Sequence, residues 1–351
     1  MPSSMTHGYF CEDVGKKVNI DVKKVLKKHI NYFKVFGQGP DPYFFYNFHL
    51  TKKSKYTYLI NKTMQHSKIN VHFIRLINYI NEKDYYYNPE VMTYLYGQIC
   101  HFVLDSTVHP FIIYNTGNYD EKNKETHKYN GLHEEMEYYI DSYLIFNREK
   151  ILPKDYKIYK KLFNIGKFGH ELNDVIDTVM KDVYGFENVS KTYYKCIMDM
   201  KKFYYVFNYD KYGVKKIVYS IMDMVCGNKC VKKKELSFYI KPDSKSYYLN
   251  NEKNIWNHPC NINEKYNYSF MELYDIATNR AVNIINNVDE MLRNKNIDNK
   301  KIKLLFKNQD YGTGKDANLN LVYKYFKFLM EHKISYCNLK YIPFFISSSE
   351  E

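Results

Sequence analysis

The sequence predicts an all-α protein built as one multi-helix domain. Apolar residues recur at spacings of three and four along much of the chain, which is the period of an amphipathic helix. The 351 residues are 45% hydrophobic and 26% charged, so the chain can bury a sizeable core. No Gly/Pro/Ser-rich linker and no internal repeat separates its halves. We therefore expect a helical core over residues 1–230 and a helical C-terminal extension over 231–351, packed on the same domain.

The first elements of the chain are two helices separated by a loop. Residues 12–36 are predicted to form a scaffold helix, with apolar residues on one face and lysines outside. The breaker-rich residues 37–42, Gly-Gln-Gly-Pro-Asp-Pro, predict a loop. The next helix is expected to begin at His66, which lies three residues before an apolar stripe and so faces inward, whereas His72 lies off the stripe and is expected at the surface. The stripe consists of Ile69, Phe73, Leu76, Ile77 and Ile80.

A third helix is predicted to begin at Asn88-Pro89-Glu90, which offers an N-cap, a proline at the first helical position and an acid in the first turn. Pro110 argues that this helix ends by His109. His101, Asp105 and His109 recur at intervals of four, which places them on nearly one face. Imidazole and carboxylate groups facing one way are ligands for zinc, although a buried polar network would use the same residues. Gly97, one turn before His101, would let another backbone come close.

A fourth helix, over residues 132–144, carries a second polar ladder. His133, Glu137 and Asp141 are again spaced by four, beside an apolar stripe. Two polar ladders that face inward are rare in a plain core, because unpaired buried carboxylates are costly. The second ladder therefore favours a metal site over a simple polar network.

The C-terminal half shows no further catalytic set. Residues 236–266 are irregular with a short hairpin, and residues 310–316 form a loop that lacks the spacing of a phosphate-binding P-loop. The remaining predicted helices cover residues 169–183, 187–208, 212–226, 268–295 and 317–333.

Charge and cysteine content restrict the compartment and the partners. The formal net charge of +13 favours phosphate-bearing partners such as an anionic membrane surface, a nucleic acid or a small anionic ester. The seven cysteines show no framework of a secreted domain, and the first thirty residues contain no apolar signal-peptide core. No apolar run approaches membrane-spanning length. We therefore expect a reducing, cytoplasmic location.

The combined motif resembles the zinc-dependent phospholipase C and S1/P1 nuclease superfamily. The resemblance is carried by Gly97-x3-His101-x3-Asp105-x3-His109-Pro110 followed by His133-x3-Glu137. The chain is especially similar to the bacterial branch, which has Thr-His near the N-terminus and Gly-Pro-Asp soon after, here Thr6-His7 and Gly39-Pro40-Asp41. The match covers residues 1–141.

The resemblance implies two or three zinc ions and a set of ligands. It assigns one zinc to Asp41, His66, His101 and Asp105, and a second to His109, His133 and Glu137. A third would bind Asp105, His7 and the N-terminal residue, for which we expect the imino group of Pro2 after removal of Met1. In the family Asp41 also orients or deprotonates the nucleophile, and Asp141 is expected to accept a hydrogen bond from a ligand imidazole.

Three functions remain open at this point. The resemblance favours a phospholipase C-type phosphodiesterase that acts on a phospholipid at an anionic membrane surface. A single-strand nuclease or nucleotide phosphodiesterase on the same scaffold is the alternative, since aromatic stacking plus positive charge would serve it equally well. A non-catalytic protein stabilised by structural zinc is the third. Tyr43, Phe44 and Phe45 are expected at the lip of a lipid cleft or in a base-stacking shelf, with core packing as the other reading.

Overall fold

The computed structural model describes residues 4–49, 52–120, 123–207, 212, 214–226 and 247–327. It confirms the all-α class, because the only strands in these residues are β1 (Trp256–His258) and β2 (Asn261–Tyr266), which pair as an antiparallel hairpin. None of the described helices combines the length and the apolar character needed to cross a bilayer. The predicted boundary at residue 230 lies outside the described residues, as does Pro2.

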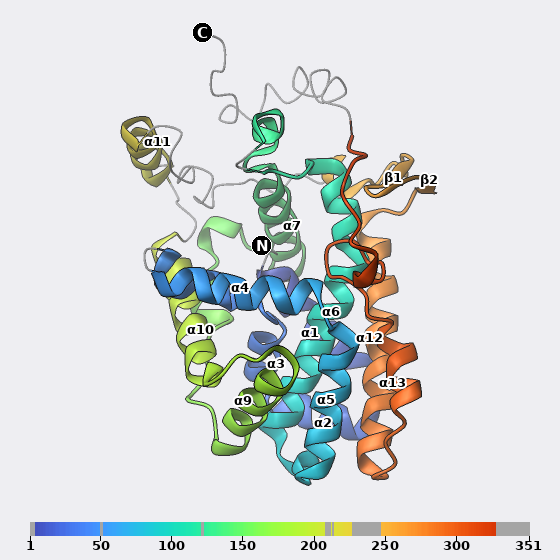
Figure 1. Cartoon of the computed structure of the whole chain (residues 1–351). Coiled ribbons are helices and arrows are strands. Elements are labelled where there is room, and N and C mark those ends of the chain that lie inside the picture. Colours follow the sequence, from blue (N-terminus) through green and yellow to red (C-terminus); the bar gives the residue numbers. More distant parts are fainter. Residues whose placement is uncertain are drawn as a thin grey trace.

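The described residues form thirteen α-helices, and the longest of them, α6, lies near the centre of the molecule (Figure 1). In chain order the α-helices of the described residues are α1 (Ser4–Lys17), α2 (Ile20–Lys28), α3 (Ile30–Phe36), α4 (Lys52–His66), α5 (Ile69–Glu82), α6 (Pro89–Thr116), α7 (Leu132–Glu149), α8 (Ile158–Lys161), α9 (His170–Tyr184), α10 (Val189–Val206), α11 (Val214–Cys226), α12 (Phe270–Arg293) and α13 (Asn299–Phe306). Short 3-10 segments are η1 (Asp41–His49), η2 (Tyr85–Tyr87), η3 (Lys124–Tyr129), η4 (Pro153–Asp155), η7 (Tyr247–Leu249) and η8 (Ala317–Leu319).

The central helix is α6, and it begins as the sequence predicts. The Asn88 side chain accepts hydrogen bonds from the backbone N–H groups of Glu90 and Val91, with Pro89 at the first helical position. The predicted end is wrong, because α6 continues through Pro110 to Thr116. A proline inside a helix costs about 3 kcal/mol. The residues that follow it are almost all buried, and their burial offsets that cost.

The single helix predicted over residues 12–36 is divided into parts of α1, α2 and α3. Asn19 ends the first segment and caps α2, since its side chain accepts a hydrogen bond from the Val22 N–H at 2.9 Å. The Asn19 N–H in turn donates to Asn286 of α12 at 2.9 Å. Contacts with distant helices therefore break a segment whose local pattern favours one helix.

The segment around His66 also differs from the prediction. His66 is the last residue of α4, a helix that the sequence analysis does not identify, and α5 begins at Ile69 after a left-handed turn at Lys68. The prediction that His72 is exposed is wrong. Its ring is 4% exposed and lies 5.5 Å from the ring of Phe73 and 5.7 Å from that of Tyr184.

The C-terminal half packs against α6 through α12, which begins with a capping box formed by Ser269 and Glu272. The helix predicted over residues 317–333 is wrong for the part described, where η8 is followed by irregular chain, and residues 328–333 lie outside the described residues. After α13 the chain turns back to the centre, and the loop 307–316 docks there. The Tyr311 N–H donates to the Gln65 carbonyl at 3.0 Å, which joins this loop to the end of α4.

Candidate metal centre

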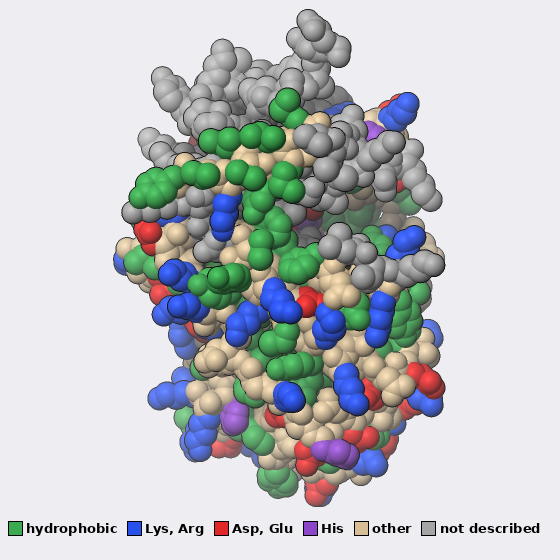
Figure 2. Space-filling view, turned by 90° about the vertical axis from the view of Figure 1, so that its left-hand side faces the viewer, with side chains coloured by type: hydrophobic (Ala, Val, Ile, Leu, Met, Phe, Trp, Pro, Cys, Tyr) green, Lys and Arg blue, Asp and Glu red, His purple; other side chains and the backbone are tan. Residues whose placement is uncertain are grey.

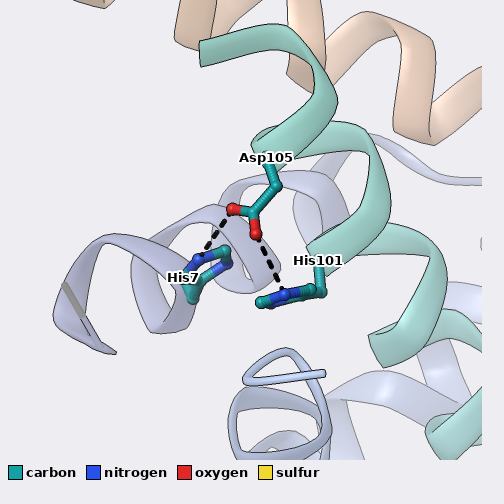
Figure 3. Close-up of side chains that lie close together, drawn as sticks. All are labelled: His7, His101 and Asp105. Carbon is teal, nitrogen blue, oxygen red and sulfur yellow. Dashed lines mark ion pairs between the residues drawn. The ribbon is translucent and has the colours of Figure 1, made fainter. Parts of the chain in front are cut away.

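The first group of candidate ligands joins α1 to α6. The Asp105 carboxylate lies between two imidazoles, with Oδ1 3.2 Å from His7 Nε2 and Oδ2 3.0 Å from His101 Nε2 (Figure 3). All three side chains are buried, and the two rings stack with their centroids 4.4 Å apart. Asp41 Oδ1 lies 3.9 Å from His101 Nε2, at the edge of the group.

The position of His7 depends on α7. Asp141 of α7 accepts hydrogen bonds from the Met5 N–H at 3.1 Å, the Thr6 N–H at 2.7 Å and the Thr6 hydroxyl at 2.8 Å. A carboxylate at a helix N-terminus satisfies N–H groups that have no partner within the helix. The resemblance implies that Asp141 accepts a hydrogen bond from a ligand imidazole, and the structure shows it bonded to the turn that carries His7.

The second group follows on the next turn of α6. Glu137 Oε1 of α7 lies 2.9 Å from His133 Nε2 and 3.5 Å from His109 Nε2. The two groups are neighbours, because His109 Nδ1 is 3.8 Å from Asp105 Oδ2. A cavity of about 10 Å³ lies against both groups, lined among others by His7, Asp105, His109 and Glu137. That volume is about the size of one water molecule.

Backbone carbonyls orient two of the imidazoles. His101 Nδ1 lies 3.1 Å from the Gly37 carbonyl oxygen, and His109 Nδ1 lies 3.1 Å from the Tyr311 carbonyl oxygen. A carbonyl can only accept, so Nδ1 donates in both rings, and in the neutral imidazole the lone pair is on Nε2. Nε2 of His101 faces Asp105 and Nε2 of His109 faces Glu137, as a metal ligand requires.

Two glycines make these approaches possible. A Cβ on Gly97 would lie 2.7 Å from the Phe36 carbonyl carbon and 2.9 Å from the Gly37 nitrogen, so α6 and the end of α3 touch through their backbones. This confirms the prediction that Gly97 admits another backbone. Gly39 has φ of 52°, and a Cβ there would lie 2.3 Å from the His101 ring.

Burial and the pairing of imidazoles with carboxylates determine the electrostatics of both groups. Burial disfavours ionisation of Asp105, but the surrounding imidazoles outweigh it and hold its pKa well below the usual range. Burial likewise disfavours the charged form of His109, yet the Asp105 and Glu137 carboxylates raise its pKa to about 9. Burial, together with the neighbouring His101, lowers the pKa of His7 to about 4. Burial raises the pKa of Asp41 to about 7.

The donor set fits zinc. Ligand atoms about 2.1 Å from a tetrahedral zinc ion lie roughly 3.4 Å from one another. The four imidazole-to-carboxylate distances of the two groups are between 2.9 and 3.5 Å. Within the described residues, His101 Nε2 and both Asp105 oxygens are buried without a hydrogen bond of good geometry. Buried polar atoms without such partners are costly unless an ion satisfies them.

A cleft of about 480 Å³ opens onto the second group. Its wall includes His109 and His133 from this group, and Asp41 from the edge of the first. The Gln65 amide donates to Asp41 Oδ1 at 3.0 Å and fixes this carboxylate at the cleft. Lys62 and His66 of α4 also line the cleft. The cleft therefore connects the second group to solvent.

His66 is not part of either group in this conformation. Its Nδ1 lies 2.5 Å from Asp310 Oδ2 in the docked loop, and its side chain is 45% exposed. The other oxygen of Asp310 accepts from the N–H groups of Gly312 at 2.9 Å and Thr313 at 2.6 Å. Asp310 therefore holds His66 at the cleft wall beside Asp41.

The three aromatic residues after the Gly-Pro-Asp loop have different positions. Tyr43 and Phe45 are 2% and 4% exposed and pack in the core, so the alternative of core packing applies to them. Phe44 lines the cleft, where its ring lies 5.4 Å from that of Tyr58.

Several residues at the site carry no signal in the sequence. Gln65, Asp310 and the Tyr311 carbonyl act through contacts between segments that are far apart along the chain. Lys62 belongs to a lysine-rich segment of ordinary appearance. The spacing of Lys62 and His66 by four is the one sequence feature that could have predicted that both lie on the cleft side of α4.

Comparisons with models of protein families, with curated proteins and with solved structures found no match for this chain.

Proposed function

We propose that this chain is a zinc-dependent phosphodiester hydrolase that cleaves a phospholipid in the manner of a phospholipase C. The observation that carries the proposal is the presence of two adjacent three-ligand groups, one of which faces a cleft of about 480 Å³. Structural zinc sites are usually closed by four protein ligands, whereas catalytic sites keep a position open. The three-ligand groups thus favour an enzyme over a protein that is merely stabilised by zinc.

Bound by these groups, zinc would supply hydroxide at neutral pH and neutralise the charge of a phosphodiester. The residues of the cleft provide the other requirements. Asp41 is fixed through Oδ1 by Gln65, and with a pKa raised by burial to about 7 it can take up and release a proton at neutral pH. Lys62 lines the same cleft and places a positive charge where an anionic ester would enter.

The cleft also offers apolar surface for the organic part of the ester. Phe44 and Tyr58 form an aromatic pair in its wall, and Ile113 lines it as well. These groups suit the glycerol backbone and the first methylenes of a lipid. The same aromatic pair would stack nucleobases, so a single-strand nuclease is the second candidate.

The test combines metal content with a substrate panel. Purified protein is analysed for zinc and assayed on phosphatidylcholine, on single-stranded nucleic acid and on a soluble nitrophenyl phosphodiester. We expect at least two zinc ions and hydrolysis of the lipid. His133→Ala should lose zinc and turnover together, while His170→Ala, an exposed histidine at the start of α9, should change neither. Full zinc content without hydrolysis of any phosphodiester would refute the proposal.

A further inference from the structure

The solvent face of α4 leads from the surface into the cleft. Lys55, Leu59, Lys62 and His66 follow one another at spacings of four, three and four, so they form one stripe along the helix. All four side chains are exposed, and the last two line the cleft. The stripe is therefore continuous with the wall of the candidate active site.

This face is positive and partly apolar. The sequence of α4 contains neither aspartate nor glutamate. Across the described residues, no ion pair is formed by Lys55 or Lys62, and the Lys62 ammonium lies 5.1 Å from the centre of the Tyr58 ring. Leu59 is 52% exposed, and Tyr58 is 38% exposed beside it. Lysines alternating with exposed aliphatic and aromatic groups are typical of surfaces that lie on a membrane interface.

Helix α11 adds aliphatic side chains on the same side of the molecule as the N-terminal end of α4 (Figure 1). Ile217, Ile221 and Met224 are spaced by four and three and are 58%, 56% and 83% exposed. Figure 2 looks at this side and shows hydrophobic side chains over the upper part, a band of Lys and Arg side chains across the middle, and carboxylates that are more frequent toward the lower end. Exposed aliphatic groups of this kind contribute to binding when they enter the acyl region of a bilayer, whereas a nucleic acid offers them little.

We propose that the solvent face of α4, with the apolar stripe of α11 on the same side of the molecule, docks on an anionic bilayer and so presents a lipid headgroup to the cleft. The lysines supply the attraction to anionic headgroups, and Leu59 and the α11 stripe supply the apolar contact. The role of the cleft in this inference rests on the proposed function. Vesicle binding is measured without turnover, so membrane docking and phosphodiester hydrolysis can be refuted separately.

The experiment uses the full chain and vesicles of phosphatidylcholine with or without phosphatidylserine, and measures co-sedimentation. We expect binding to rise with phosphatidylserine and to fall with added salt. Loss of one lysine near an anionic surface lowers partitioning roughly fivefold. Lys55→Gln with Leu59→Gln should therefore reduce binding at least fivefold, while hydrolysis of a soluble nitrophenyl phosphodiester stays unchanged, because neither residue lines the cleft.

A matched control lies on α13, at the lower right of Figure 1. Lys300 and Leu304 are also spaced by four, and Leu304 is 70% exposed, yet no residue of α13 lines the cleft. Lys300→Gln with Leu304→Gln removes the same groups and should leave vesicle binding within about twofold of wild type. Equal losses in the two double variants would mean that general basicity explains binding, and the proposal would be wrong. Vesicles that bind no protein, or retention of only single-stranded oligonucleotides through Lys55, would also overturn it.

Discussion

Replacing Gly97 by alanine tests how closely α6 must approach the loop that supports the metal groups. The new methyl group would lie 2.6 Å from the Phe36 Cβ and 2.7 and 2.9 Å from backbone atoms of Phe36 and Gly37. Backbone atoms cannot move aside as the end of a side chain can. Overpacking of this kind typically costs about 1–3 kcal/mol.

Helix propensity acts in the opposite direction and must be separated from packing. Alanine is favoured over glycine by about 1 kcal/mol in a helix interior. Gly15 of α1 provides the control, because a Cβ there would be 3.5 Å or more from its neighbours, which is ordinary contact. Gly15→Ala gains propensity without overlap, so the difference between the two variants isolates the packing cost. We expect Gly97→Ala to be about 1–3 kcal/mol less stable than Gly15→Ala.

The assay is urea unfolding of both variants in the presence of a chelator, so that bound metal does not contribute. Zinc affinity is then measured separately. Gly37 is the residue whose carbonyl orients His101, so a shift of this backbone should lower zinc affinity by about 10-fold or more in Gly97→Ala and leave it unchanged in Gly15→Ala. Equal stability and equal zinc affinity of the two variants would refute the close backbone contact as described.

Three further predictions concern the site and its surroundings. A chelator should lower the free energy of unfolding of the zinc-loaded protein by about 3–4 kcal/mol, as expected for loss of a ligand present at about 100–1,000 times its dissociation constant. In Asp105→Asn the chelator should have a much smaller effect, and thermal scans measure both. Asp310→Asn keeps an acceptor for the loop N–H groups but removes the carboxylate that pairs with His66. Because His66 lies outside both ligand groups, zinc affinity measured by competition with a chelating dye should stay within about twofold of wild type, with the unfolding free energy little changed. Burial lowers the pKa of His72 from 6.5 to about 4, so its neutral form contributes stability above pH 6.5 that is lost as the pH falls toward 4. This shift in pKa corresponds to about 3 kcal/mol of unfolding free energy. His72→Leu should therefore flatten the pH dependence of the unfolding free energy over this range.

The candidate ligands were predictable where helix geometry alone decides their direction. His101, Asp105 and His109 lie on one face because residues four apart on a helix must do so, and the same holds for His133 and Glu137. The grouping was predictable only in part. The second group matches the one inferred from the resemblance, whereas His66 of the first points to Asp310, a partner 244 residues away.

Helix ends depend on contacts that the sequence does not reveal locally. Pro110 is a strong local signal for a helix end, yet α6 continues because the side chains beyond it, including Phe111 and Ile112, are buried in the core. The opposite error occurs between residues 12 and 36, where an apolar period that runs through Asn19 suggests one helix. There, the hydrogen bond between Asn19 and Asn286 of a distant helix stabilises the break.

The loop 307–316 illustrates a part of the site that no residue pattern could have indicated. Its contribution to His109 is a backbone carbonyl, that of Tyr311, and every residue type possesses this group. The orientation of the His109 imidazole therefore depends on the position of the docked loop. That position depends on the hydrogen bond from the Tyr311 N–H to the Gln65 carbonyl and on the contact of Gly314 with Ser106. A methyl group on Gly314 would lie 2.4 Å from the backbone carbonyl oxygen of Ser106, so the lack of a side chain at Gly314 permits the docking. Within α6 the Ser106 carbonyl would normally accept from the N–H of residue 110, but Pro110 has no N–H. The proline of the predicted motif and Gly314 of the distant loop therefore lie at the same carbonyl.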